Sequence, residues 1–219
     1  MDKQTTCDII KMGIEARKQY IQGWYWLAGG VFASILGLLL PPLLVLAIIL
    51  VIIGLVITAI AFLSHLDVLK RIRLETPYDP HTPVLLAIAL QIATGLISLI
   101  VIISAGDFQH PPITANLFSA IANFVIFITL YRQMYIQIEK ALNISLDIAY
   151  SLGVFESIFV SIKMLISEPA AGLVIGFFIL AAMYFQLSEF LGAYKDAWKN
   201  QCNDETAPPP QNTYNTNRT

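Results

Sequence analysis

Long apolar blocks alternate with short charged stretches along this chain. The first block, residues 24–63, contains no Asp, Glu, Lys or Arg. About 20 apolar residues, rising 1.5 Å each, match a hydrocarbon core of roughly 30 Å, so this block is too long for one ordinary membrane span. Pro41 and Pro42 interrupt it, and proline disfavours helix in the residue before it. The pattern therefore predicts two spans, at 24–40 and 43–65, joined by a tight turn.

The following blocks predict further spans. Residues 67–83 are charged and contain turn-forming residues, so we expect a loop there. A third span is expected at 84–104 and a fourth at 113–131, separated by a turn that contains two prolines. A last apolar block at 170–187 predicts another span, and the Asn- and Thr-rich tail after it is expected to be disordered.

The segment at 147–167 is nearly balanced between the bilayer and its surface. Each strongly apolar residue favours insertion by about 0.3 to 0.6 kcal/mol. Glu156 and Lys163 oppose insertion, since a charge at the centre of a span costs roughly 2.5 to 3.5 kcal/mol. Lys163 lies near the segment's end, where its side chain can reach the headgroups. We therefore expect a fifth span, and the alternative is an interfacial amphipathic helix at 140–166.

These patterns predict an all-α, polytopic transmembrane helical bundle of six spans arranged as three hairpins, or five spans plus the interfacial helix. Each hairpin is expected to turn at proline, and each returning helix to continue into an amphipathic stretch, at 65–75, 132–142 and 189–199. The expected organisation along the chain is an amphipathic N-terminal segment (1–23), a transmembrane domain (24–199) and a polar tail (200–219).

Charge sets the expected orientation. With six spans, all but one of the 13 Lys and Arg residues fall on one side of the membrane, and Lys163 is the exception. Because basic loops stay in the cytoplasm, we expect a multi-pass protein of the cell membrane with both termini cytoplasmic. Cys7 and Cys202 lie in the terminal segments, and we expect two free, reduced thiols there.

Composition and motifs exclude several function classes. The chain is 57% hydrophobic and 13% charged, and it has no Lys/Arg-rich block that would bind nucleic acid. It also lacks the zinc-protease, serine-hydrolase, P-loop and dinucleotide motifs, so we expect neither an enzyme nor a cofactor. His65, Asp67, Asp79 and His81 are metal-ligand residue types, but their charged stretch is better explained as a solvated loop without a metal.

Small residues repeat at helical spacing inside the expected spans. Helices associate within lipid through small residues and interhelical hydrogen bonds, since lipid tails are as apolar as leucine. Gly29 and Gly37 are expected to pack the first span and Gly54 the second. Gly172 and Gly176 form a GxxxG pattern in the last span. Ordinary helix packing explains all of these positions.

Polar residues in the third and fourth spans share one spacing. Gln91 and Asn123 are at similar depths in an antiparallel hairpin, so we predict that their amides face each other. The pair serves either as an interhelical hydrogen bond or as the polar lining of a substrate path.

Glu156 is the acidic residue expected nearest the bilayer midplane. Lys163 points in nearly the same direction but lies roughly 10.5 Å away along the helix axis, too far for a direct ion pair. Glu156 must then be protonated, hydrated or paired with another helix. Three interpretations remain open: a water-facing residue, a structural hydrogen bond, or a transport or ligand role of the kind that in-membrane carboxylates often have.

Two function classes fit these features. The first is a non-enzymatic membrane-embedded subunit or scaffold that binds other membrane proteins or further copies of itself. The alternative is a small transporter or channel for an ion or small molecule. It would use in-membrane polar residues, for which Glu156, Lys163, Gln91, Asn123 and His65 are the candidates.

Overall fold

The computed structural model describes residues 2–37, 40–106, 113–166 and 169–202. Within these ranges the chain forms helices and no strands. The elements are, in order, α1 (Lys3–Gly37), α2 (Pro42–Glu75), α3 (His81–Ala105), α4 (Ile113–Ile126), η1 (Phe127–Tyr131), α5 (Arg132–Leu142), α6 (Asp147–Leu165) and α7 (Pro169–Gln201). The α4, η1 and α5 segments follow one another without a break, and η1 is a π-helical turn.

Five helices in the described chain are long and apolar enough to cross a membrane: Pro42–Glu75, His81–Ser104, Ile113–Leu142, Asp147–Leu165 and Ala171–Gln201. The protein is therefore a polytopic helical membrane protein. The segment that is balanced between bilayer and surface in its composition, 147–165, is one of the five. The first expected span, 24–40, is not among the five: its residues up to Gly37 form the second half of α1, and residues 38 and 39 lie outside the described residues. The polar tail also lies outside them from residue 203 onward.

The expected loop at 67–83 is wrong over its first half, because α2 continues to Glu75. Val68, Leu69 and Ile72 are fully buried, while the neighbouring basic residues stay largely on the accessible side. This spacing matches an amphipathic helix, as the expected amphipathic stretch at 65–75 requires. The loop is thus reduced to the few residues between α2 and α3.

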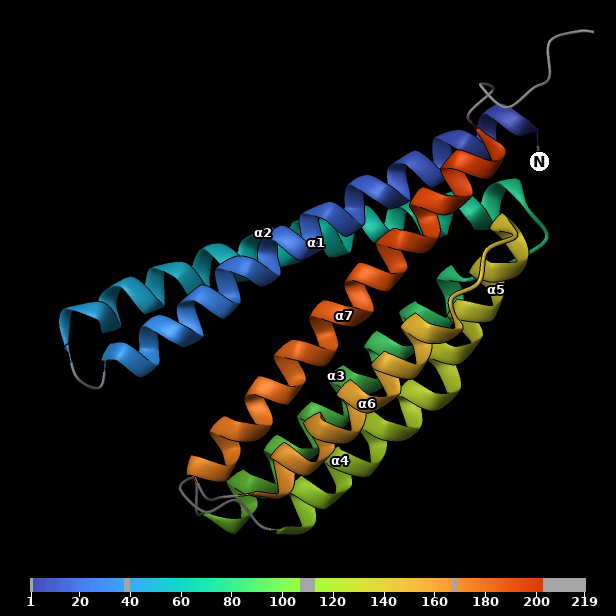
Figure 1. Ribbon diagram of the computed structural model, residues 1–219. Coiled ribbons are helices and arrows are strands. Elements are labelled where there is room, and N and C mark those ends of the chain that lie inside the picture. The colour runs from blue at the N-terminus through green and yellow to red at the C-terminus, as the bar shows by residue number, and fades with distance from the viewer. Residues whose placement is uncertain (1, 38–39, 107–112, 167–168, 203–219) are drawn as a thin grey trace, which may run out of the picture.

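Three helical hairpins make up the molecule: α1–α2, α3–α4 and α6–α7. Figure 1 shows that they form a V, with α1 and α2 as one arm and α3, α4 and α6 as the other. Helix α7 packs against both α6 and α1 and so connects the two arms. The arms converge where the described chain begins and ends. We call this the polar end, and the opposite end the apolar end.

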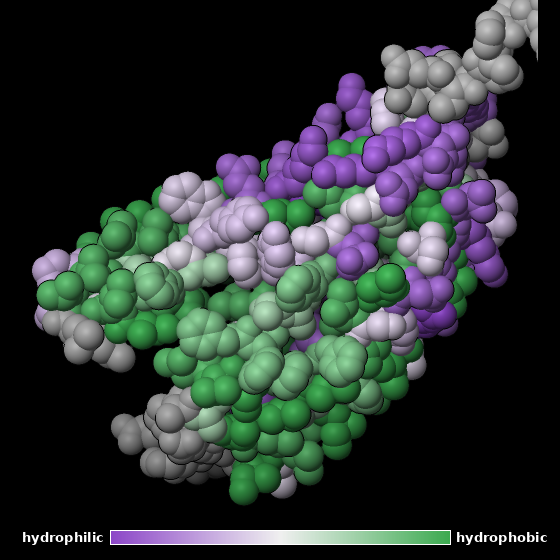
Figure 2. Space-filling view, viewed as in Figure 1, coloured by the Kyte–Doolittle hydropathy of each residue, from purple (hydrophilic) through white to green (hydrophobic). Residues whose placement is uncertain are grey.

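The main hydrophobic core lies at the polar end. It joins buried side chains from α1, α2, α3, α5, α6 and α7, among them Ile10, Leu69, Ile138, Phe190 and Tyr194. Charged residues cover this end, whereas the two arms expose apolar side chains (Figure 2). In the most hydrophobic stretch of each of the five spanning helices, only 11 to 17% of the residues is buried inside the protein. The arms therefore present a lipid-facing surface, and the polar end holds them together.

Glycines allow α1 and α2 to pack closely. Gly23, Gly30 and Gly37 recur every seven residues on α1, and at each a Cβ atom would meet α2 within 3.1 Å of a backbone nitrogen. Gly54 faces Leu27 in the same way, as expected of a packing residue. The close contact between α1 and α2 is at Gly30 rather than at the expected Gly29. A Cβ atom at Gly29 would make only an ordinary van der Waals contact.

The expected GxxxG packing in the last span is also only partly present. A Cβ at Gly172 would meet the side chain of Lys163, so this glycine leaves room for a lysine rather than for a helix backbone. Gly176 faces open space, with nothing within 4 Å of a Cβ there.

The prediction of two free cysteines is wrong. Cys7 near the start of α1 and Cys202 at the end of α7 form a disulfide across a sequence separation of 195 residues, with their Cα atoms 5.6 Å apart. Large sequence separation hid the pairing, since only the packing of α7 against α1 brings the two ends together. The disulfide joins the first and last helices at the polar end.

Candidate functional site

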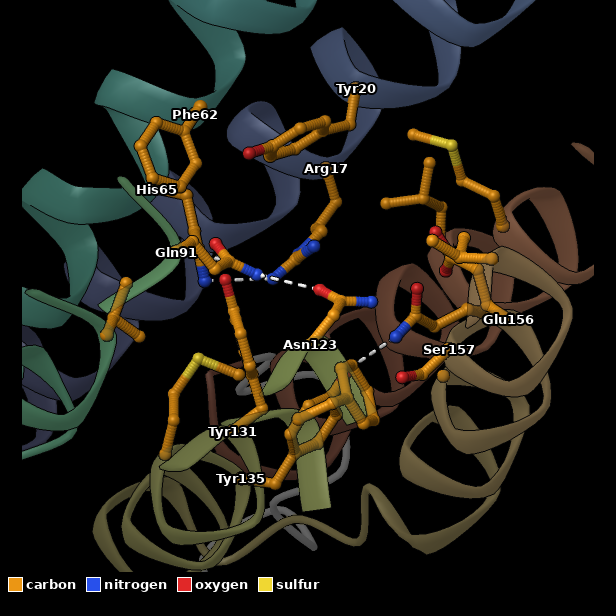
Figure 3. Close-up of a pocket in the computed structure, with 18 residues that line it drawn as sticks. Arg17, Tyr20, Phe62, His65, Gln91, Asn123, Tyr131, Tyr135, Glu156 and Ser157 are labelled. Carbon is orange, nitrogen blue, oxygen red and sulfur yellow. Dashed lines mark hydrogen bonds between the residues drawn. The ribbon is translucent and has the colours of Figure 1, made fainter. Parts of the chain in front are cut away.

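A cavity of about 370 Å³ lies between the two arms near the polar end (Figure 3). Every helical segment of the described chain contributes to its wall. Its polar lining consists of Arg17 and Tyr20 of α1, His65 of α2, Gln91 of α3, Asn123 of α4, Tyr131 of η1, Tyr135 of α5, Glu156 and Ser157 of α6, and Gln186 of α7. The cavity is open to the surface, and its volume is at the lower end of the range for small-molecule sites.

Four of the five residues proposed from the sequence line this cavity. His65, Gln91, Asn123 and Glu156 come from four different helices, and the fold brings them to one place. Lys163 does not reach the cavity. It lies two turns further along α6, where its side chain packs against Gly172 of α7. In agreement with their helical spacing, Glu156 and Lys163 form no ion pair in the described chain.

The predicted amide pair is present. Gln91 Nε2 donates a hydrogen bond to Asn123 Oδ1 at 3.3 Å, which links α3 to α4. Nearer the apolar end, the Ser98 and Ser119 hydroxyls form a second bond between these helices at 2.5 Å. Both amides also line a second cavity of about 210 Å³, which reaches Met164 near the apolar end of α6. The amide pair therefore stands between two cavities.

Arg17 is the cation of the site, and its side chain is 7% exposed. Its Nη2 donates to His65 Nε2 at 2.9 Å. Because a guanidinium can only donate, that ring nitrogen of His65 must be unprotonated. The guanidinium carbon also lies 3.7 Å from the centre of the Phe190 ring, a cation–π contact. Arg17 Nε has no hydrogen-bond partner, and no carboxylate of the described chain pairs with this residue.

Helix α6 supplies the acidic group. Glu156 is partly buried and makes no hydrogen bond or ion pair with any described residue. The next residue, Ser157, is 4% exposed, and its hydroxyl is buried without a partner. Unpartnered polar atoms are costly in a protein interior. Glu156 and Ser157 thus place two polar groups without a protein partner next to each other on the α6 side of the cavity.

Aromatic side chains form much of the remaining wall. Phe127 and Tyr131 are on the π-helical turn η1, and such turns are frequent at functional sites because they redirect side chains. The Tyr135 hydroxyl accepts a hydrogen bond from Gln186 Nε2 at 2.9 Å. Burial raises the pKa of the Tyr20 hydroxyl far above its ordinary value, so this group stays neutral. The wall thus combines neutral hydrogen-bonding groups with aromatic faces.

The residues considered as metal ligands do not gather. Among the described residues no group of three or more His, Cys, Asp and Glu side chains is placed to hold a metal ion. His65 is hydrogen-bonded to Arg17, and Asp79, in the loop before α3, accepts hydrogen bonds from Thr82 in the first turn of α3. The geometry of the polar cavity is therefore the main guide to function.

No family model, curated protein or solved structure matches this chain.

Sequence reasoning missed several residues of the cavity, above all Arg17, Ser157 and Gln186. Arg17 stands in a charged N-terminal segment, where a solvated side chain was the natural expectation. A signal was present, because Ile10, Gly13 and Arg17 share one face of the helix at spacings of three and four, and all three are buried. An arginine in line with buried residues is a candidate for a buried cation.

Proposed function

We propose that this protein is a small membrane transporter that binds the polar part of its substrate in the central cavity. The observation that carries the proposal is the convergence of His65, Gln91, Asn123 and Glu156, from four helices, on one cavity. Polar residues within membrane-spanning helices are costly to retain, and they commonly mark substrate or ion pathways. Structural hydrogen bonding alone does not require four helices to direct such groups at one open space.

The second cavity supports transport rather than binding alone. It continues from the amide pair towards the apolar end along α3, α4 and α6. Gln91 and Asn123 line both cavities, and one hydrogen bond of 3.3 Å joins them. An interhelical hydrogen bond of this kind contributes only about 0.6 to 2 kcal/mol, so thermal motion can open it. In this proposal the amide pair is the gate between the two cavities.

The proposed location is the cell membrane, with the polar end in the cytoplasm. Its support is the positive-inside rule, since all but one of the basic residues belong to that side in the six-span arrangement. The Cys7–Cys202 disulfide is at the same end, and disulfides are rare in reducing compartments. The two features predict opposite sides of the membrane for the polar end, and labelling of introduced cysteines distinguishes them.

The binding part of the proposal can be tested before the substrate is identified. The protein is purified in mild detergent and denatured, and the released lipids and small molecules are quantified by mass spectrometry. We expect at least one compound near equimolar amount that is depleted several-fold in Glu156→Gln protein. Lys163→Gln is the matched control, because it removes an in-membrane charge outside the cavity. Identical compounds in the Glu156→Gln and wild-type samples would contradict the proposal.

The transport part needs a second measurement. Liposomes that contain the protein are supplied with the enriched compound on one side, and its appearance on the other side is followed over time. Asn123→Leu removes one partner of the gate and should alter the rate of transfer. Binding without any transfer above protein-free liposomes would reduce the proposal to a binding protein.

A membrane-embedded subunit or scaffold is the second candidate. It is favoured by the α1–α2 arm, whose exposed apolar residues continue along most of α2, for example Val45, Ile52 and Ile60. Helices of a partner protein can cover such a surface as well as lipid can. A scaffold should bring other proteins with it in mild detergent, whereas a transporter should purify alone or as a homo-oligomer.

A further inference from the structure

The cavity holds one cation and one acid that do not neutralise each other. Arg17 has no carboxylate partner in the described chain, and Glu156 has no cationic one. Figure 3 shows that they come from different sides of the cavity, Arg17 from α1 and Glu156 from α6. Burying an unpaired charge is strongly unfavourable, and direct pairing is the usual remedy. Two separated groups of opposite sign instead match a ligand that carries both signs.

The surroundings of the two groups fit such a ligand. On the Arg17 side, the guanidinium hydrogen-bonds only to His65 in the described chain and its Nε has no partner, so donors remain for an anion. Next to Glu156, the hydroxyl of Ser157 is unpartnered, and Tyr131 of η1 and Tyr135 of α5 line the same cavity. Aromatic faces and a carboxylate together are the usual recognition elements for an ammonium group.

The shape of the molecule indicates how the ligand reaches the cavity. Beyond the cavity the two arms separate, and Figure 2 shows an open cleft between two apolar surfaces at the apolar end. The cavity is at the junction of these arms, since its wall includes residues of both. A molecule with a polar head and apolar chains could therefore place its head in the cavity and its chains between the arms or in the adjoining bilayer.

We propose that the cavity binds the headgroup of a zwitterionic phospholipid, with the phosphate at Arg17 and the ammonium at Glu156. This inference rests on the proposed function and names its substrate class. A free zwitterion has the same charges, but the apolar cleft beside the cavity favours the lipid. The cavity volume of about 370 Å³ suits a headgroup rather than an entire lipid.

The test uses the full-length protein, delipidated in detergent, and native mass spectrometry to measure bound ligand. Four probes are titrated: phosphatidylethanolamine, phosphatidylglycerol, diacylglycerol and soluble phosphoethanolamine. We expect phosphatidylethanolamine to bind at least about tenfold more tightly than the other three, because it alone combines both charges with acyl chains. Equal binding of phosphatidylethanolamine and diacylglycerol would overturn the inference.

Variants assign the two halves of the headgroup. Arg17→Gln should weaken phosphatidylethanolamine binding by about tenfold or more, and Arg17→Lys should restore part of it, which shows that the loss follows the charge rather than the fold. Glu156→Gln should leave phosphatidylglycerol binding unchanged and remove the preference for ethanolamine over glycerol. Lys163→Gln should match the wild type. An unchanged preference in Glu156→Gln protein would overturn the assignment of the ammonium.

The probes also separate this inference from the proposed function. If soluble phosphoethanolamine binds as tightly as the lipid, the cavity takes a free zwitterion, so the lipid is wrong while the transporter stands. If none of the four probes binds but another compound co-purifies and is lost from Glu156→Gln protein, the substrate class is wrong and the function again stands. If no compound at all depends on Glu156, both proposals fail.

Discussion

Individual polar residues of the cavity wall differ in how far the protein itself satisfies them. Gln91 and Asn123 bond to each other, whereas Arg17 Nε and Ser157 Oγ are buried without a partner. A satisfied pair can be explained by stability alone. Unsatisfied groups cannot, because each costs free energy in the folded protein unless something else binds them. The inference about the ligand's charges therefore rests on Arg17, Glu156 and Ser157, whereas the amide pair supports the transport proposal through its place in both cavities.

The amide pair makes a measurable prediction. Gln91→Leu and Asn123→Leu should each destabilise the protein, and the double variant should lose less than the sum of the two. We expect a coupling free energy of about 0.6 to 2 kcal/mol, the range for hydrogen bonds between membrane helices. Thermal unfolding in detergent of the wild type and the three variants gives the double-mutant cycle. A coupling near zero would show that the two amides do not interact.

Glycine packing between α1 and α2 makes a second prediction. A Cβ at Gly54 would lie 2.8 Å from the backbone nitrogen of Leu27, so Gly54→Ala must push the two helices apart. We expect a loss of about 1 to 3 kcal/mol in the free energy of unfolding, as in other overpacked sites. Gly176→Ala is the matched control, because its Cβ would meet nothing within 4 Å. Equal effects at both positions would show that close packing at Gly54 is unimportant.

At the scale of whole elements, hydrophobic periodicity predicted the helices but not where all of them end. The spans at 84–104 and 113–131 are helical in the described chain, and the uncertain segment at 147–167 is helical from Asp147 to Leu165. The boundary of α2 was misplaced because its last turns are charged on one face and buried on the other, through Leu69 and Ile72. Local composition records the charges, whereas burial depends on helices that pack there from elsewhere in the chain.

The residues of the candidate site also differ in whether the sequence predicts them. Polar residues inside apolar blocks, such as Glu156 and Asn123, stand out in the sequence because the bilayer makes them costly. Arg17 does not stand out, since it lies among other charged residues before the first span. Its role depends on α1 continuing as one helix from Lys3 to Gly37 and on the contacts of that helix with α2 and α7. Those contacts belong to the tertiary structure, and no local sequence pattern predicts them.

The disulfide between the ends of α1 and α7 makes a prediction about the links between elements. Cys7 and Cys202 close most of the chain into one loop, so their bond should stabilise the polar end. We expect reductant to lower the thermal stability of the wild type by the equivalent of about 2 to 4 kcal/mol. Cys7→Ser/Cys202→Ser protein should unfold at the lower temperature with or without reductant. If reductant does not change the unfolding temperature of the wild type, the disulfide does not stabilise the protein.

For the molecule as a whole, the core is at one end and the lipid-facing arms are at the other. The polar end unites six helical elements around buried residues such as Ile138 and Phe190. Towards the apolar end, the α1–α2 arm stands apart from α3, α4 and α6 (Figure 1). A fold fixed at one end leaves its arms free to change their separation. Such a movement would widen or narrow the access to the cavity at their junction.

The orientation of this V in the membrane is the last prediction. We expect the polar end in the cytoplasm, because the basic residues gather there. The measurement uses Cys7→Ser/Cys202→Ser protein with one new cysteine, introduced as Gln109→Cys, Glu168→Cys or Lys199→Cys. A maleimide that cannot cross membranes is added to intact cells. The first two positions, which come in the sequence between α3 and α4 and between α6 and α7, should react, and the third should react only after the membrane is permeabilised.

Each alternative arrangement gives its own labelling pattern. Reaction at Lys199→Cys with protection of both other positions would place the polar end outside, where an oxidising compartment agrees with the disulfide. Reaction at Gln109→Cys and Lys199→Cys with protection of Glu168→Cys would favour five spans over six.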